Sequence, residues 1–297
     1  MPAVRVVTDS TADVPPGIAA SLGITVIPDE VIFGQRSYRD GVDITLQQFL
    51  SRLATDPHLP QTAQPSLGTF LQVYRHLNQN AAGIVSIHVG HHLSGMVGTA
   101  QAAAAELASE MPVAVIDSQQ LSMGQGWQVI AAAQAVRLGC TFEEVVALAR
   151  RLPATARVAA MLDSLEHVRR GGRIGRVTAL VGDALRVKPL IGVTGGQPVV
   201  LGNVRTQGKA LARLADLVAA DVPFGAVAVL HTGAPAAAEQ LADLLAAFFP
   251  RQQILLAETG ATVATHLGPG AVGCCLMLAA DREIDARLFR WWELESG

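Results

Sequence analysis

Val4-Arg5-Val6-Val7-Thr8-Asp9-Ser10 is a short β-branched run that passes directly into polar residues. The same pattern returns at Ile84 to His92 and at Val113 to Ser118, where an apolar run again ends in polar side chains. Such runs predict strands that are buried on both faces, and alanine- and leucine-rich helical stretches separate them. This alternation indicates an α/β fold with a mostly parallel sheet, whose strands end at one common edge. Ligands of open α/β sheets bind outside that edge, so the loops after these runs are the first candidates for a site.

The second half of the chain has a different pattern. Helices are expected in the first half at Leu67 to Leu77, Gly98 to Ala108 and Met123 to Leu138. After Leu152-Pro153, new strand-like runs follow at Arg157 to Met161, Leu190 to Val193, Pro198 to Val200 and Ala226 to Leu230. Thr194-Gly195-Gly196 is typical of a hairpin turn, which adds antiparallel pairing. We therefore predict an N-terminal α/β domain (residues 1–153), a mixed α/β C-terminal domain (154–280) and a charged tail (281–297) with a helix held by Trp291-Trp292.

Composition excludes several classes of function. The 297 residues are 50% hydrophobic and carry a formal net charge of −3, so no global positive field exists to attract nucleic acid. The three cysteines do not form the framework of a secreted disulfide protein, and the first residues lack the basic and apolar regions of a signal peptide. No apolar stretch approaches the roughly 20 residues that span a bilayer. We expect a cytoplasmic protein without stable membrane insertion, which would have to hold any lipid in a cavity.

Two loops carry hydroxyls and amides that suit an anion. Thr62 to Ser66 precedes a predicted helix, and its hydroxyls could meet an anion there, although Ser66 alone is typical of an ordinary helix cap. His91 to Gly98 follows a buried strand and places the Ser94 hydroxyl beside the Gly95 amide. That pair could bind a carboxylate or an oxyanion. The same residues could equally form an ordinary capped loop that binds no ligand.

The histidines allow two interpretations. Thr265 to Gly270 places His266 among turn-forming residues, where the backbone would orient its ring, either for a site or for a bond to a nearby carbonyl. His88, His91 and His92 invite a metal site, but no Cys, Asp or Glu nearby completes a ligand spacing. We therefore predict no metal and no cofactor.

The segment Arg169 to Arg176 contains four arginines within eight residues of a net acidic chain. It could be a solvated turn or a docking surface for phosphate or an acidic partner, because the arginine fork binds both in a bidentate manner. Asp9, Ser10 and Asp13 are interpreted as helix caps. No dinucleotide fingerprint and no P-loop is found, so independent nucleotide chemistry is not expected.

In their order along the chain, these segments resemble the DegV family. The similarity begins with Val-Thr-Asp-Ser-Thr-Ala-Asp from Val7 and extends to about Ala280. The other matching segments are Phe33-Gly34, Tyr38 to Ile44, Thr62 to Ser66, Leu93 to Gly95, Ile116 to Ser118, Ser122 to Gly124, the arginine–glycine segment, Lys188-Pro189, Val204 to Thr206 and Thr265 to Gly270. The resemblance implies a two-domain DegV-like fold that holds one long-chain fatty acid, such as palmitate, in a buried tunnel with its carboxylate near the domain interface. It also implies a lipid-binding protein that is not itself an enzyme and presents the carboxylate to a separate fatty acid kinase, which forms the acyl phosphate.

The resemblance assigns site residues in two groups. Carried over position by position, the carboxylate group consists of Thr62, Ser94, Gly95 and His266, and the kinase-docking group consists of Arg170 and Arg173. Three neighbouring residues depart from the usual family pattern, with Ala63 in place of serine and Met96 and Leu267 in place of threonine. These departures flank the carboxylate group without replacing any member of it.

Two functions from other classes stay open at this point. A serine esterase would use Ser94 as nucleophile, His266 as base and an aspartate such as Asp117 as the orienting group, but the G-x-S-x-G elbow is missing. A nucleic-acid binder would use the arginine segment, but aromatic residues make up only 4% of the chain and no stacking platform accompanies it.

Overall fold

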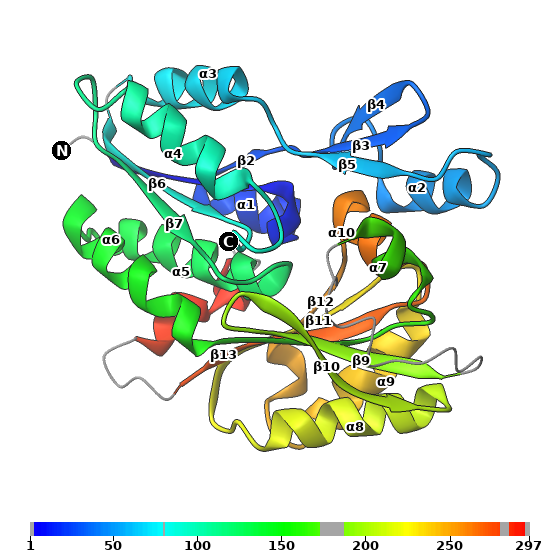
Figure 1. Cartoon of the computed structure of the whole chain (residues 1–297). Helices are drawn as coiled ribbons and strands as arrows, with labels where there is room; N and C mark the ends of the chain where they lie inside the picture. The colour runs from blue at the N-terminus through cyan, green and yellow to red at the C-terminus, as the bar shows by residue number, and fades with distance from the viewer. Residues whose placement is uncertain (1–2, 80, 173–186, 280–284, 295–297) are drawn as a thin grey trace.

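Two main sheets lie one above the other in the computed structural model, which describes residues 3–79, 81–172, 187–279 and 285–294 (Figure 1). The first sheet is parallel and has the strand order β2-β1-β6-β7. Its strands are β1 (Ala3–Asp9), β2 (Ile24–Ile27), β6 (Ala81–His88) and β7 (Val113–Asp117). The parallel sheet predicted from the β-branched runs is therefore confirmed, and polar residues follow its strands at one edge.

Helices cover both faces of the parallel sheet. They are α1 (Pro16–Leu22), α3 (Leu67–Leu77), α4 (Met96–Glu106), α5 (Met123–Arg137) and α6 (Phe142–Arg151). Adjacent residues of β1 point to opposite faces, so Val6 packs with α5 whereas Val7 packs with α3 and α4. Burial on both faces explains why apolar residues occupy adjacent positions of the strands and do not simply alternate with polar ones.

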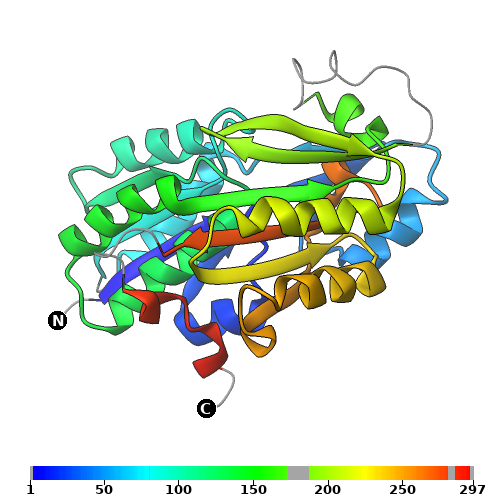
Figure 2. The same cartoon turned by 90° about the horizontal axis from the view of Figure 1, so that it is seen from below.

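The second sheet is mixed and has the order β10-β9-β8-β13-β11-β12, with parallel pairing only between β11 and β12. Its strands are β8 (Ala156–Met161), β9 (Lys188–Thr194), β10 (Gln197–Val204), β11 (Phe224–His231), β12 (Ile254–Glu258) and β13 (Val272–Leu278). The predicted hairpin joins β9 to β10, and Gly195 and Gly196 supply the two positive φ angles of its turn. Helices α8 (Gln207–Ala219) and α9 (Pro235–Leu245) cover its outer face (Figure 2).

Helix α5 lies between the two main sheets and is buried on almost every side. Two glycines allow this close packing. A Cβ atom on Gly124 would lie 2.4 Å from Val158 Cγ2 on β8, and one on Gly126 would lie 2.5 Å from the carbonyl oxygen of Ala12. The apolar core around α5 is continuous across both halves of the chain. The domain boundary near Pro153 stays a prediction.

A small antiparallel sheet of order β4-β3-β5 projects from the parallel sheet, at the upper right of Figure 1. Its strands are β3 (Glu30–Phe33), β4 (Arg36–Arg39) and β5 (Gln61–Ala63), and α2 (Leu46–Leu53) packs on it. Helices α7 (Glu166–Gly171) and α10 (Ala261–Leu267) lie directly below it in the same view. The sequence patterns used above did not predict this sheet.

The tail differs from its prediction. In place of a helix, it forms two 3-10 turns, η5 (Ala286–Phe289) and η6 (Trp291–Glu293). The expected anchoring by tryptophan is present, because Trp291 is buried and its indole nitrogen donates to the carbonyl oxygen of Gln253 at 3.1 Å. The part of the chain that the structure describes also contains the 3-10 turns η1 (Ser10–Ala12), η2 (Leu152–Thr155) and η4 (Arg251–Gln253). All three cysteines of the chain are free.

Candidate functional site

Residues from all three sheets converge below the small sheet. Thr62 lies in the middle of β5, and His266 lies in the last turn of α10. Thr62 Oγ1 and His266 Nε2 form a hydrogen bond of 3.0 Å across 204 residues of sequence. A Cβ atom on Gly171 would lie 2.4 Å from His266 Nδ1, so the backbone at the end of α7 lies directly against the imidazole ring. The ring is therefore held between β5 and α7.

Ser94 and Gly95 belong to the loop that joins β6 to α4. Ser94 Oγ accepts a hydrogen bond from the backbone N–H of Met96 at 3.2 Å and contacts Gln64 Oε1 at 3.4 Å. A Cβ atom on Gly95 would lie 2.8 Å from the same amide oxygen, so the Gln64 side chain crosses the loop in close contact with Gly95. Gly95 is the N-cap residue of α4, a position at which backbone N–H groups attract anions.

These polar groups line a cavity of about 450 Å³. Thr62, Ser94, Gly95 and His266 all belong to its wall, which lies between the small sheet, the two loops and the inner face of the six-stranded sheet. The sequence-predicted carboxylate group is thus brought together in space. Its role as a ligand for a carboxylate stays a prediction.

The floor of the cavity is apolar and comes from the six-stranded sheet. Two rows of paired residues run across β9, β8 and β13 and lie on the same face of the sheet. One row is Ile191, Ala160 and Gly273, and the neighbouring row is Val193, Val158 and Cys275. A cavity of a few hundred Å³ that combines apolar walls with a small number of polar groups is typical of a small-molecule site.

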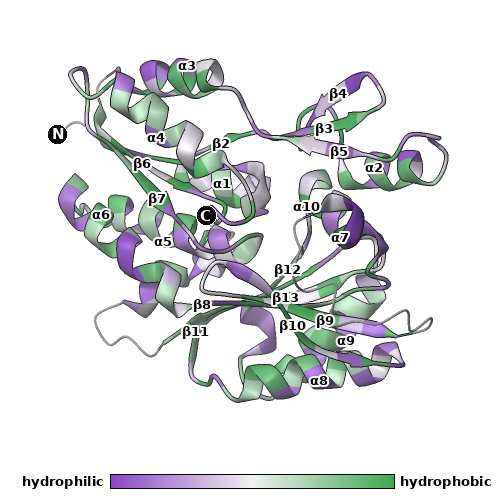
Figure 3. Ribbon diagram, viewed as in Figure 1, coloured by the Kyte–Doolittle hydropathy of each residue, from purple (hydrophilic) through white to green (hydrophobic). Residues whose placement is uncertain are grey.

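A second, polar hollow of about 430 Å³ lies on the other side of the Thr62–His266 pair. The same two residues line it, together with His167 and Arg170 of α7. Figure 3 shows that α7 is strongly hydrophilic. Arg170 is half-exposed and forms an ion pair with Glu166. Arg173, the second predicted docking residue, lies outside the described residues.

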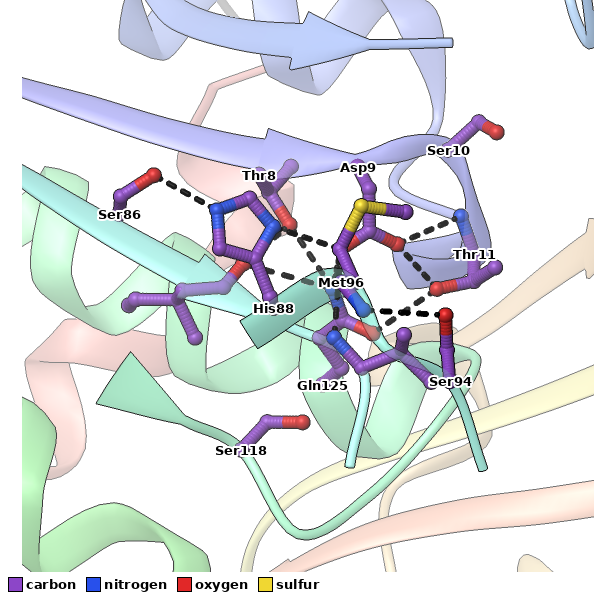
Figure 4. Close-up of polar contacts among 12 residues, drawn as sticks. Thr8, Asp9, Ser10, Thr11, Ser86, His88, Ser94, Met96, Ser118 and Gln125 are labelled. Carbon is purple, nitrogen blue, oxygen red and sulfur yellow. Dashed lines mark hydrogen bonds and ion pairs between the residues drawn. The ribbon is translucent and has the colours of Figure 1, made fainter. Parts of the chain in front are cut away.

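A buried polar network lies behind the Ser94 loop (Figure 4). His88 Nε2 contacts Ser86 Oγ at 2.7 Å, His88 Nδ1 contacts Asp9 Oδ2 at 2.8 Å, and Gln125 Nε2 donates to the same carboxylate oxygen at 3.1 Å. Burial alone would raise the pKa of Asp9, but its hydrogen bond and charge interaction with His88 hold that pKa below the ordinary value. The order Ser86–His88–Asp9 is that of a hydrolase triad, yet all three side chains are fully buried and none is among the described residues that line the cavity. The network therefore joins β1 to β6.

The contacts do not favour the esterase arrangement. Asp117, the proposed orienting group, accepts from the backbone N–H of His91 at 3.2 Å and contacts His91 Nδ1 at 2.5 Å. Ser94 makes its contacts with Gln64 and Met96. In the described parts of the chain, no cluster of three or more His, Cys, Asp or Glu side chains could hold a metal ion.

Sequence reasoning placed His266 in a turn, and this was wrong. His266 lies on helix α10, which ends only at Gly268, where φ is +77°. The reasoning also missed the long-range contacts of Asp9 with His88 and of Asp13 with Gly260. Asp9 caps η1 as expected, but Asp13 accepts a hydrogen bond from the backbone N–H of Gly260 at 2.7 Å, and burial raises the pKa of Asp13 to about 8. No local pattern signals these contacts, because the partners are far apart in sequence.

Comparison with known proteins decides the family. The family model described as "DegV: Uncharacterised protein, DegV family" matches residues 3–279. The chain belongs to the DegV family. A DegV domain-containing protein of Deinococcus radiodurans is 37% identical over 276 residues, which are 92% of this chain and 98% of that protein. Protein DegV of Bacillus subtilis is 30% identical over 276 residues, which are again 92% of this chain and 98% of the relative.

Solved structures of DegV proteins share the fold. One, described as fatty acid binding of a DegV family protein from Thermus thermophilus, has a TM-score of 0.86 and 32% identity and covers 93% of this chain and 99% of that chain. Another, described as DegV, a fatty acid binding protein from Bacillus subtilis, has a TM-score of 0.84 and 29% identity and covers 94% and 100% of the two chains. The predicted DegV-like α/β fold is therefore confirmed. Among the described residues, no helix combines the length and the apolar character needed to cross a bilayer.

Proposed function

We propose that this DegV protein binds one long-chain fatty acid in the cavity, with the carboxylate at Thr62, Ser94, Gly95 and His266. The observation that carries the proposal is a cavity that combines an apolar floor on the six-stranded sheet with polar groups at the Thr62–His266 pair. Two DegV proteins with 32% and 29% identity are described as binding fatty acids, which supports the same ligand class here.

The apolar floor accounts for most of the expected affinity. Burial of a methylene group contributes about 0.8 kcal/mol, so a chain of roughly sixteen carbons gains on the order of 10 kcal/mol before the costs of association are subtracted. A ligand of this kind leaves slowly, and we expect protein purified from a bacterial host to carry it.

The polar groups of the cavity make burial of the carboxylate tolerable. An ionised carboxylate without hydrogen bonds is strongly disfavoured in an apolar cavity. The hydroxyls of Thr62 and Ser94 and the amide of Gly95 are donors, and hydrogen bonds to a charged group each contribute about 1.5–3 kcal/mol. His266 already shares a hydrogen bond with Thr62, so it would fix the orientation of that hydroxyl.

Mass spectrometry of the lipid released from purified, denatured protein tests the ligand class. The proposal predicts a fatty acid near one per chain. Protein that carries no fatty acid, and that fails to bind added palmitate after delipidation, would refute the proposed function.

We further propose that the protein presents the carboxylate to a separate kinase, which forms the acyl phosphate, and that the protein performs no chemical step itself. The polar hollow supports this, because Thr62 and His266 line both the cavity and the hollow, and Arg170 stands at the outer rim. An arginine at such a rim governs encounter and docking more than ligand affinity.

Alanine substitution tests the docking role. Arg170→Ala, alone and together with the predicted docking residue Arg173→Ala, should leave the Kd for palmitate unchanged and lower acyl-phosphate formation by an added fatty acid kinase with ATP. Arg75→Ala is the matched control, because Arg75 lies on the distant helix α3, is also exposed and also forms an ion pair with a glutamate. Equal turnover of all variants across protein concentrations and salt would show that the arginines form an ordinary solvated turn.

A further inference from the structure

The amino terminus of α10 is capped by side chains from distant parts of the chain. Gly260, the N-cap residue, has no side chain that could accept the first backbone N–H groups of the helix. Asp40 supplies both carboxylate oxygens instead, accepting from Ala261 N at 2.8 Å and from Thr262 N at 3.0 Å. Asp13 accepts from Gly260 N at 2.7 Å. The caps come from 221 to 247 positions away in sequence, so they fix α10 relative to the rest of the fold.

Asp40 lies next to the small sheet that carries Thr62. It directly follows β4, and its backbone N–H donates to the carbonyl oxygen of Asp29 at 2.8 Å. β4 pairs with β3, and β3 pairs with β5, where Thr62 lies opposite Val31. Val31 in turn packs in one apolar cluster with Ala261 of α10. The segments of the small sheet and its flank thus contact both ends of α10, through Asp40 and Val31 at its amino terminus and through Thr62 at its last turn.

The position of α10 matters because the helix is short and its contacts at His266 are tight. A helix of seven residues is not stable by itself, so its position depends on tertiary contacts. The imidazole of His266 has Thr62 Oγ1 at 3.0 Å on one side and the backbone of Gly171 on the other. A small shift of α10 would therefore break the bond to Thr62 or press the ring against α7.

We propose that Asp40, assisted by Asp13, is a positioning residue for the fatty-acid carboxylate, because it fixes α10 and thereby holds His266 against Thr62. This inference rests on the proposed function. Neither aspartate is among the described residues that line the cavity, so both act through the helix and not on the ligand. Both are buried, with exposed fractions of 4% and 8%.

The test compares palmitate binding to delipidated wild type, Asp40→Asn and Asp43→Asn. The Asp40→Asn side chain keeps its shape and loses one of the two oxygens that accept from the helix. This change should raise the Kd for palmitate by about tenfold, which corresponds to the loss of one hydrogen bond. Asp43→Asn is the matched control, because Asp43 lies in the same loop, is exposed and pairs with Arg39. Its Kd should stay within about twofold of wild type.

A double-mutant cycle with His266→Gln separates positioning from a general structural role. If Asp40 acts through His266, then Asp40→Asn should add little to the loss already caused by His266→Gln. The inference would be overturned if Asp40→Asn raised the Kd for palmitate by the same factor in the wild type and in the His266→Gln variant. It would also be overturned if Asp40→Asn bound palmitate with wild-type affinity.

Gly260→Ala provides a second variant in case Asp40→Asn does not fold. It keeps both carboxylates, but its Cβ atom would lie 2.7 Å from Asp40 Oδ2 and displace the cap. We expect Gly260→Ala to weaken palmitate binding as Asp40→Asn does, and to have little further effect in the His266→Gln variant. Wild-type affinity of Gly260→Ala would count against the inference. Failure of the wild type to bind palmitate would instead refute the proposed function itself.

Discussion

Replacing Ala160 by leucine should fill part of the cavity floor and shorten the fatty acid that binds best. Ala160 is 7% exposed and lies between Ile191 on β9 and Gly273 on β13, in the row that faces the cavity. The leucine side chain takes the room of about three methylene groups, and each buried methylene contributes about 0.8 kcal/mol. The variant should therefore bind palmitate about 2.4 kcal/mol more weakly, which is roughly 50-fold in Kd.

Isothermal titration with saturated fatty acids from about ten to about eighteen carbons measures this effect directly. Acids that are shorter by about three carbons should bind the variant and the wild type equally well. Ala212→Leu is the matched control, because Ala212 is exposed on α8, on the outer face of the same sheet. An unchanged dependence of Kd on chain length in a normally folded Ala160→Leu protein would refute the assignment of this row to the acyl chain.

Three further changes test the polar groups. Thr62→Ala and Ser94→Ala should each weaken palmitate binding by about tenfold, and the double variant should bind more weakly than either single variant. Unchanged affinity of the double variant would rule out this carboxylate site. His88→Leu removes the imidazole partner of the buried Asp9 carboxylate and should lower the free energy of unfolding in urea by about 3 kcal/mol. His91→Leu, at a half-exposed histidine, should lower it by less than about 1 kcal/mol, and equal losses would argue against a structural ion pair. The folded chain keeps the proton of Asp13 up to about pH 8, whereas the unfolded chain releases it near pH 3.8, so the stability from this group is lost as the pH rises through that window. Relative to Asp13→Asn, the wild type should lose stability between pH 3.8 and 8, and parallel urea curves would contradict the raised pKa.

The parallel sheet could be predicted from the sequence because its strands are buried on both faces. The runs from Val4, Ile84 and Val113 are rich in apolar, β-branched residues, so the local pattern and the final environment agree. The hairpin at Gly195-Gly196 could be predicted for a similar reason, since its turn requires two residues with positive φ.

The small sheet could not be predicted in the same way. Its strands span only three or four residues, and β4 is mostly exposed, so no run long enough to show a period exists. The tail was assigned to a helix from Trp291-Trp292, but the aromatic side chains anchor 3-10 turns equally well.

The candidate site came from the resemblance and not from local patterns. Thr62 and His266 are 204 positions apart, and each alone is typical of an ordinary cap or turn. The caps on α10 escaped notice because Gly260 gives no local capping signal and Asp40 lies 221 positions away from Ala261. Long-range hydrogen bonds of this kind leave no periodic trace in a sequence.

The most direct test of the central claim is carbon-13 NMR of palmitate labelled at the carboxyl carbon, bound to the wild type and to the Thr62→Ala, Ser94→Ala double variant. The account predicts one bound carboxyl resonance in the wild type, distinct from that of free palmitate and shielded from titration by bulk solvent, which moves toward the free value in the double variant. A bound resonance that titrates like aqueous palmitate, or that is identical in the two proteins, would show that the carboxylate does not lie at Thr62 and Ser94.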